Sequence, residues 1–520
     1  TIEAEDIANL ASSNVSGETG IAQINLPFRY AIPQTTNITP DTHGLWEDYD
    51  EDMRIWRYRI RAEGAPHINL GFTEFYLPRN SRLYVYSADG KHILRAFTDQ
   101  DNNKNNQLWT PPVMAEEIII ELTVPKITNN TLQLTLGSVN VGYRGYDSLS
   151  ESLRQARNTF CNHIDVVCPE GDPYCPQIRS VAAMSFGGGV FCSGFMVNNT
   201  AQDETPYFMT AYHCGVRQNN AASLVCIWNF ETSICNGVPD GQTTQFTSGA
   251  TWISEYRESD FTLVRLNQTP PPQFNVVYAG WDRRDGLITT SHVAVSHPRG
   301  CEKRITFDNQ PALGFGSWYG VVPDTHLLVG PWDDGNTEPG SSGSPVFDQN
   351  GRVVGQLHGG SLTCDPDLDP NCWCDQNLIR SWYGRFFISW TGNNTPTSRL
   401  SDYLDPNSTG QETLDFIDPQ NACSQAPPGP TGIYVAKYRV YDSSCNELTE
   451  TYTLEGTVAD APIALDVDCN NSAYLAVGNG ADILIQKLTP NYSTRQVDDS
   501  VLPAVVGGLN LESEPKLRTL

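Results

Sequence analysis

Short runs in which apolar and polar residues alternate dominate the chain between residues 43 and 146. Residues 56–60 and 118–122 are two such runs, and Gly, Pro, Asn and Asp residues separate them. Alternation places the apolar side chains of an extended strand on one face, and turn residues connect successive strands. The pattern predicts a β-sandwich in residues 1–150. Because the first cysteine is Cys161, we expect this region to be built separately from the next one.

The second region, residues 156–423, combines short β-like segments with many Gly and aromatic residues and most of the cysteines. This combination is typical of all-β barrels. A Pro- and Gly-rich linker at 424–432 ends the region, and residues 433–520 again contain β-like runs. A chain of 520 residues exceeds a single domain of about 100–200 residues, so several domains of an all-β class are expected.

The charge balance is acidic, with 60 acidic and 33 basic residues and a formal net charge of -27. Long-range repulsion disfavours binding to nucleic acid or to an anionic membrane. No apolar run reaches the ~18 residues that span a bilayer. No secretory leader begins at Thr1, so a signal peptide has either been removed or was not included. We therefore expect neither a nucleic acid partner nor a membrane span.

The 14 cysteines are scattered, without paired Cys-x-x-Cys motifs followed by spaced histidines. A zinc framework is therefore not indicated, and no metal or cofactor is expected. An even number of cysteines in this pattern favours disulfides formed in an oxidising compartment. The sequence thus predicts a secreted, extracellular protein.

A serine between small residues is the first candidate for chemistry, in the run Gly-Ser-Ser-Gly-Ser-Pro at 340–345. A tight turn there presents the hydroxyl of Ser342 while the amides of Gly340 and Ser342 point at one spot. Such a pair of amides forms an oxyanion hole, which is commonly worth a few kcal/mol.

A base and a carboxylate occur in matching contexts. His213 ends an apolar strand beside Cys214, and a bridge to Cys192 would fix its position. Asp260 begins an apolar alternating run, where a buried carboxylate can meet the imidazole. Each context alone is common, but the order His, Asp, Ser inside one predicted double barrel indicates nucleophilic catalysis with Ser342 as nucleophile.

Several longer motifs lie around His213 and Asp260 and at residues 161–170, 279–284, 337–345, 355–360 and 398–402. Together they resemble the lysyl endopeptidase branch of the trypsin-like serine proteases, which bacteria secrete as precursors. The resemblance covers residues 156–420, and residues 43–146 resemble the pro-region of such enzymes. It implies two six-stranded antiparallel barrels with the triad in the cleft between them.

The resemblance also implies disulfides and an aromatic pair. Trp318 and His358 match a stacked pair beside the family's active site, next to Gly359. The implied bridges are Cys161–Cys364, Cys168–Cys235 and Cys192–Cys214. The cysteines beyond the family pattern, whose pairing the sequence does not settle, are Cys175, Cys226, Cys301, Cys372 and Cys374.

The substrate pocket is where the sequence departs from the family. Lysine selectivity in this branch depends on an aspartate shortly before a Tyr-Gly-Arg segment, present here at 383–385. Counting back without a gap gives Ser381, whereas an insertion after the pair Asp375-Gln376 would give Asp375. A serine offers only a neutral hydrogen bond, while a lysine ammonium needs a buried carboxylate. Specificity for lysine or for another P1 residue is left open, with Ser381 slightly favoured.

Three further questions remain open at this level. The acidic run 365–370 is either a solvated loop or a calcium site. The junction before Cys161 offers Arg154 and Arg157 but no lysine for self-cleavage. The main hypothesis is a monomeric endopeptidase that acts on proteins or peptides and is held latent by its own N-terminal pro-region. The alternative is a catalytically inactive binding protein that uses its flanking β domains.

Overall fold

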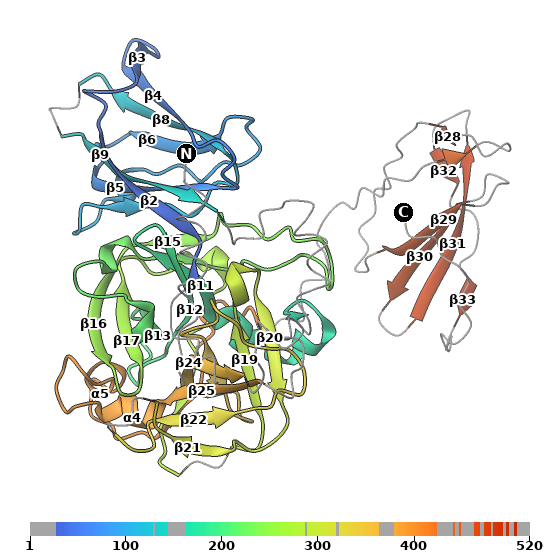
Figure 1. Cartoon of the computed structure of the whole chain (residues 1–520). Coiled ribbons are helices and arrows are strands. Elements are labelled where there is room, and N and C mark those ends of the chain that lie inside the picture. The colour runs from blue at the N-terminus through green and yellow to red at the C-terminus, as the bar shows by residue number, and fades with distance from the viewer. Residues whose placement is uncertain are drawn as a thin grey trace. The chain divides into compact units, whose positions relative to one another are not determined.

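The computed structural model describes residues 28–127, 131–143, 163–286, 289–318, 322–362 and 379–423, and the backbone of seven short strands between 440 and 506. The chain divides into two compact units, Thr1–Gln420 and Asn421–Leu520. Strands dominate both units, so the all-β prediction is confirmed (Figure 1). Among the described residues, no helix combines the length and apolar character needed to cross a membrane.

The N-terminal region is a sandwich of two four-stranded sheets with strand orders β2-β9-β5-β7 and β3-β4-β8-β6. In β8, Ile118, Ile120, Leu122 and Val124 are fully buried while their neighbours are partly exposed. This is the alternation seen in the sequence, and it places one face of the strand in the core. The strands are β2 (Ala31–Ile38), β3 (Leu45–Asp48), β4 (Met53–Arg61), β5 (Ile68–Tyr76), β6 (Arg82–Ser87), β7 (Leu108–Trp109), β8 (Glu117–Pro125) and β9 (Gln133–Gly142).

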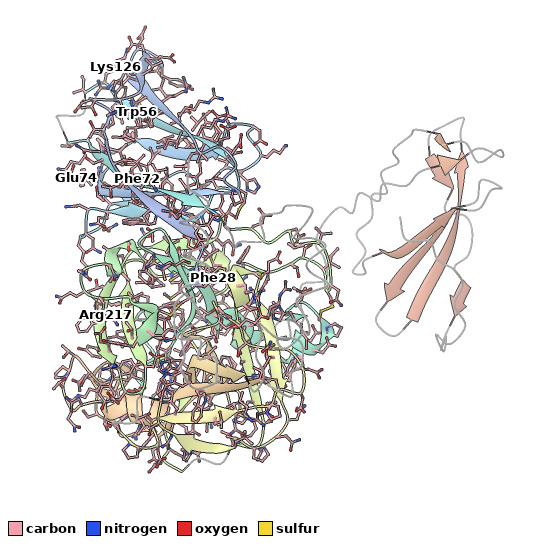
Figure 2. The ribbon with its side chains drawn as sticks, in the orientation of Figure 1. Phe28, Trp56, Phe72, Glu74, Lys126 and Arg217 are labelled. Carbon is pink, nitrogen blue, oxygen red and sulfur yellow. A yellow bond between two sulfur atoms is a disulfide. The ribbon has the colours of Figure 1, made fainter. Side chains whose placement is uncertain are left out.

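The sandwich shares its hydrophobic core with the region that follows it. Phe28, labelled in Figure 2, belongs to β1 (Phe28–Arg29), which pairs with Phe191 in the barrel strand β12. Phe97 of the sandwich lies edge-on against Phe246 of the barrel, with ring centroids 5.9 Å apart. The expectation of a separately built unit is therefore wrong in this respect. The distribution of cysteines reports on disulfides and says nothing about which apolar faces pack together.

The first barrel is an eight-stranded sheet with the order β15-β14-β11-β12-β13-β17-β16, and β1 is its eighth strand. Its strands are antiparallel, and register partners such as Thr210 and Thr262 join β13 to β17. This pairing brings the ends of two strands together at His213 and Asp260. The strands are β11 (Val181–Phe186), β12 (Val190–Met196), β13 (Tyr207–Ala211), β14 (Val225–Ile227), β15 (Phe246–Ser248), β16 (Ala250–Tyr256) and β17 (Phe261–Leu266).

The second barrel is a ten-stranded sheet with the order β10-β20-β19-β23-β24-β25-β22-β21, to which β18 and β26 add. Both sheets thus exceed the six strands implied by the family resemblance, because short strands are added at their margins. The strands are β10 (Ile164–Asp165), β18 (Trp281–Asp282), β19 (His292–Ser296), β20 (Arg304–Asp308), β21 (Gly314–Gly316), β22 (His326–Val329), β23 (Pro345–Phe347), β24 (Val353–Leu362), β25 (Ile379–Arg385) and β26 (Thr413–Leu414).

The described residues of this unit also form three short α-helices: α3 (Cys175–Ser180), α4 (Phe386–Thr391) and α5 (Ser401–Leu404). The C-terminal unit contains a two-stranded hairpin and a five-stranded sheet in which β29, β30, β31 and β32 are neighbours and β33 pairs with β31. Its strands are β27 (Val440–Tyr441), β28 (Glu447–Leu448), β29 (Pro462–Val467), β30 (Ala473–Asn479), β31 (Asp482–Asn491), β32 (Gln496–Asp498) and β33 (Ala504–Val506).

Candidate active site

The structure brings His213, Asp260 and Ser342 into one hydrogen-bonded group. His213 lies in the 3₁₀ turn Tyr212–Cys214 that follows β13. Its Nδ1 lies 2.8 Å from Asp260 Oδ2, and its Nε2 lies 2.8 Å from Ser342 Oγ. Its backbone N–H also donates to Asp260 Oδ1 at 2.9 Å. The carboxylate therefore holds both the main chain and the ring of His213.

Asp260 is fully buried and has a strained backbone. Its φ of 57° lies in the left-handed region, which costs a residue with a side chain about 1–3 kcal/mol. The backbone is held there because Asp260 N–H donates to Arg257 O and Asp260 O accepts from Tyr212 N–H. Burial raises the pKa of the Asp260 carboxyl, and the charge and hydrogen bonds of His213 oppose that shift. Those hydrogen bonds stabilise the carboxylate in a site without water contact.

Ser342 lies in a turn between two glycines that need their conformations. Gly340 has φ +100° and Gly343 has φ +84°, and a Cβ on Gly343 would lie 2.2 Å from Thr210 Oγ1. The turn is tied to the first barrel because Ser193 N–H donates to Ser342 O at 2.9 Å. The nucleophile candidate thus belongs to the second barrel but is fixed against the first.

Two peptide groups of this turn are oriented by hydrogen bonds to their carbonyls. Pro339 O accepts from Arg299 N–H at 2.6 Å, and Ser341 O accepts from Ser344 N–H at 3.0 Å. Because a trans peptide is planar, its N–H points away from its C=O. The N–H groups of Gly340 and Ser342 are therefore turned away from these partners. Within the described part of the chain, neither donates a hydrogen bond to a protein acceptor, as a site that receives an oxyanion requires.

A row of aromatic rings begins at His213. The His358 ring stacks on His213 with centroids 5.2 Å apart, and Trp318 lies 4.5 Å from His358. The Trp318 and His358 pair implied by the resemblance is thus present beside His213. Sequence reasoning missed His326, whose Nε2 lies 2.8 Å from His358 Nδ1. Burial lowers the pKa of His326 to about 3, and it lowers that of His358 well below its usual value, so both rings are neutral.

The predicted pocket residue Ser381 lies inside the second barrel. It is fully buried in β25 and pairs with Gly360 of β24, beside Gly359. Its Oγ lies 2.8 Å from Thr337 Oγ1 and accepts from Trp332 Nε1 at 3.0 Å. Thr337 precedes the serine turn, so Ser381 lies between that turn and the Gly359–Gly360 edge. The alternative, Asp375, and the acidic run 365–370 lie outside the described residues.

Two of the three implied bridges occur in the structure, Cys168–Cys235 and Cys192–Cys214. The second fastens the strand that carries Ser193 to the turn that carries His213. The third, Cys161–Cys364, lies outside the described residues, as do Arg154 and Arg157. Of the extra cysteines, Cys175 is disulfide-bonded and Cys226 is a buried thiol whose pKa burial raises, while Cys372 and Cys374 lie outside the described residues. Cys423, at the end of the predicted protease region, is also disulfide-bonded.

Metal-ligating atoms converge at one place among the described residues. Nitrogen and oxygen atoms of His213, Asp260 and His358 lie within 4.8 Å of one another. Two of these residues already bind each other, and His358 Nδ1 is bonded to His326. The cluster is therefore the hydrogen-bonded site itself, and its donors are used within it.

Sequence relatives of the chain carry a consistent description. Residues 157–372 match the family described as lysyl endopeptidase, C-terminal domain. The lysyl endopeptidase of Pseudomonas aeruginosa is 28% identical over 374 residues, which cover 66% of this chain and 76% of that protein.

Solved structures show weaker overall similarity. The active form of the Rv3671c protease from M. tuberculosis is 18% identical, with a TM-score of 0.26 over 41% of this chain and 78% of that chain. Deg5 is 14% identical, with a TM-score of 0.23 over 40% of this chain and 86% of that chain.

The double barrel and the sequence relatives define a serine protease of the trypsin-like kind. Within that class, the chain is a lysyl endopeptidase-like protease, which confirms the resemblance seen in its motifs.

Proposed function

We propose that the chain is the precursor of a secreted serine endopeptidase that cleaves proteins or peptides through an acyl-enzyme. The observation that carries the proposal is the continuous hydrogen-bonded line from Asp260 through His213 to Ser342. Disulfides support an extracellular setting.

Each residue of the line has a defined task in the proposed reaction. His213 Nε2 takes the Ser342 proton as Oγ attacks the peptide carbonyl, and the N–H groups of Gly340 and Ser342 receive the oxyanion. His213 then gives the proton to the leaving amine. A water molecule attacks the acyl-enzyme in the same way and restores the serine. Asp260 keeps Nδ1 protonated, so that Nε2 is free to accept.

The N-terminal sandwich is the proposed pro-region of a monomeric precursor. It contacts the first barrel through hydrogen bonds such as Trp109 N–H to Ser248 Oγ at 3.1 Å, as well as through the shared core. The three residues of the line are within bonding distance while the sandwich is attached. Latency would then come from restricted access rather than from a broken triad.

Fluorophosphonate labelling tests the proposal against the alternative of an inactive binding protein. We expect covalent modification of Ser342, located by peptide mass spectrometry, and no modification after heat denaturation. A well-folded chain that stays unlabelled and cleaves no peptide, both intact and after removal of the sandwich, would support the binding-protein alternative instead.

Ser381 gives a prediction about selectivity. We propose that it faces the P1 side chain, because it lies between Thr337 and Gly360. Its hydrogen-bond partners among the described residues are neutral hydroxyl and indole groups, so we expect cleavage after uncharged P1 residues rather than a strict preference for lysine.

The variant Ser381→Asp is then expected to raise kcat/KM for lysine at P1 by about tenfold or more, because a buried carboxylate offsets the desolvation of the ammonium. Cleavage of a peptide library by both proteins measures the change, with Ser381→Asn as the isosteric neutral control. A strict lysine preference in the unmodified protein that Asp375→Asn abolishes would assign the pocket to Asp375.

A further inference from the structure

A short loop of the second barrel holds residues 338–340, the segment that precedes Ser342. We call residues 297–301 the bracket, which contains the 3₁₀ turn Pro298–Gly300. Two backbone contacts connect it to the segment: Arg299 N–H donates to Pro339 O at 2.6 Å, and a Cβ on Gly340 would lie 2.9 Å from Arg299 N. The bracket thus fits closely against the peptide that presents the Gly340 N–H.

A buried carboxylate joins the same two segments. The Glu338 side chain is only 2% exposed and forms an ion pair with Arg299 Nε. His163 Nε2 lies 3.7 Å from its other oxygen. A carboxylate removed from water needs such partners, because an uncompensated buried charge is strongly destabilising. Glu338 lies four positions before the nucleophile, so the loss of its partners would destabilise the serine turn.

Arg299 has a conformation that its contacts must maintain. Its φ of 51° and ψ of 24° are left-handed, which is unfavourable for an arginine. Its backbone N–H binds Pro339 and its guanidinium binds Glu338, so it holds the segment at two consecutive residues. The planar peptide between Pro339 and Gly340 is thereby fixed with its N–H on the side opposite to Arg299.

The bracket itself rests on the first barrel. The His297 ring is fully buried, lies parallel to Phe230 with centroids 5.9 Å apart, and has its pKa lowered to about 3 by burial. Its backbone N–H donates to Ser193 Oγ at 3.0 Å, and that hydroxyl donates to Gly340 O at 2.9 Å. The bracket therefore holds the segment while it is itself fixed to the first barrel.

We propose that Arg299 is a positioning residue for the oxyanion hole: through its ion pair with Glu338 and its N–H bond to Pro339, it fixes the direction of the Gly340 N–H. This inference rests on the proposed peptidase function. Its consequence is that the direction of the Gly340 N–H depends on an ion pair between two loops of the second barrel.

Arg299→Ala removes the ion pair and leaves the buried Glu338 carboxylate without its guanidinium partner. We expect kcat to fall about 10- to 100-fold with KM nearly unchanged, because loss of a whole oxyanion donor costs about 10²–10³ in kcat. The affinity for a peptide boronate, which places an oxygen in the hole, should fall with kcat. Glu338→Gln should have a smaller effect of the same kind, since its amide leaves no buried charge.

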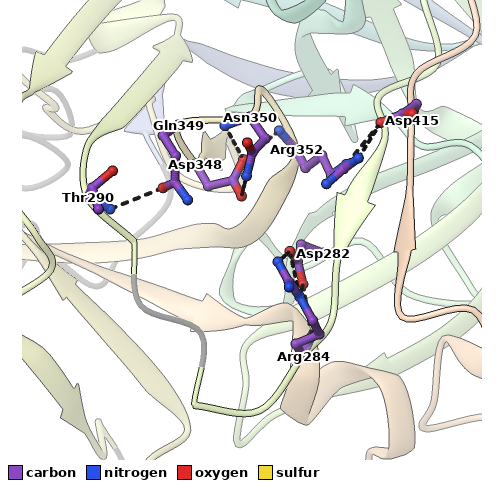
Figure 3. Close-up of polar contacts among 8 residues, drawn as sticks. All are labelled: Asp282, Arg284, Thr290, Asp348, Gln349, Asn350, Arg352 and Asp415. Atoms are coloured by element: carbon purple, nitrogen blue, oxygen red, sulfur yellow. Dashed lines mark hydrogen bonds and ion pairs between the residues drawn. The ribbon is translucent and has the colours of Figure 1, made fainter.

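The matched control is Arg352→Ala. Arg352 binds Asp415 at 2.8 Å in a surface ion pair of the same domain (Figure 3), and we expect unchanged kcat. The double variant Arg299→Ala with Glu338→Gln should be no slower than Arg299→Ala, because the buried charge of the carboxylate is gone. Arg299→Lys, which keeps the charge, should recover part of kcat and also guards against misfolding of the alanine variant.

The outcomes separate this inference from the proposed function. An active unmodified enzyme whose kcat and boronate affinity are the same in Arg299→Ala would overturn the positioning role. Strictly additive losses in the double variant would do so too, because they would show no coupling between the two residues. An unmodified chain that is neither labelled nor active would instead count against the peptidase itself.

Discussion

Replacing Ser342 by alanine is expected to reduce kcat by about a millionfold, because the nucleophile and the hydrogen bond that activates it are lost together. The Oγ lies 2.8 Å from His213 Nε2, so its proton is the one that the base is positioned to accept. KM should change little, since the removed hydroxyl contributes mainly to bond making. Steady-state hydrolysis of a peptide amide substrate, with enzyme concentration set by total protein, measures the loss.

Two further variants make the Ser342→Ala result specific. His213→Ala should give a loss of similar size, and the double variant should be no worse than either single one, because the two side chains act as one unit. Ser344→Ala, two positions further on, removes a buried hydroxyl of the same turn and should retain most activity. A Ser342→Ala enzyme that kept a substantial part of its kcat would place the nucleophile elsewhere.

The sequence predicted those features that depend on local patterns. Alternation in residues 118–122 identified β8, because burial on one face of a strand has a period of two. Glycines on both sides of Ser342 identified the turn, because their φ values of +100° and +84° exclude other residues. His213 and Asp260 were recognised because each adjoins an apolar strand, and the pairing of β13 with β17 brings them together.

The features that the sequence did not predict depend on contacts between distant segments. No sequence motif near Arg299 indicates its role, because its partner Glu338 comes from another loop and the ion pair forms only on folding. His326 looks like an ordinary strand residue until its Nε2 meets His358. The shared core was not predicted for the same reason. Phe28 and Phe191 each lie in an apolar pattern, but the pattern does not show which residues pack against each other. The Cys161–Cys364 bridge and the role of Asp375 stay predictions.

Asp260→Asn is expected to lower kcat by about 10⁴, because the amide favours the wrong form of the His213 ring. Asp260 accepts two N–H bonds, one on each oxygen, from the backbone and from Nδ1 of His213. An asparagine has a single oxygen. If that oxygen keeps the backbone N–H, the NH₂ group faces Nδ1 and forces the ring proton onto Nε2, which then cannot take the Ser342 proton.

The control for Asp260→Asn is Asp285→Asn, which alters an exposed carboxylate of the second barrel that binds Arg385 and should leave kcat unchanged. Rates of fluorophosphonate labelling should fall in parallel with kcat, since both need the Ser342 proton removed. Unfolding temperature should change far less than activity, because the amide fills the same space. A nearly normal labelling rate would mean that Nε2 stays unprotonated without the carboxylate, and that Asp260 only supports the fold around its strained backbone.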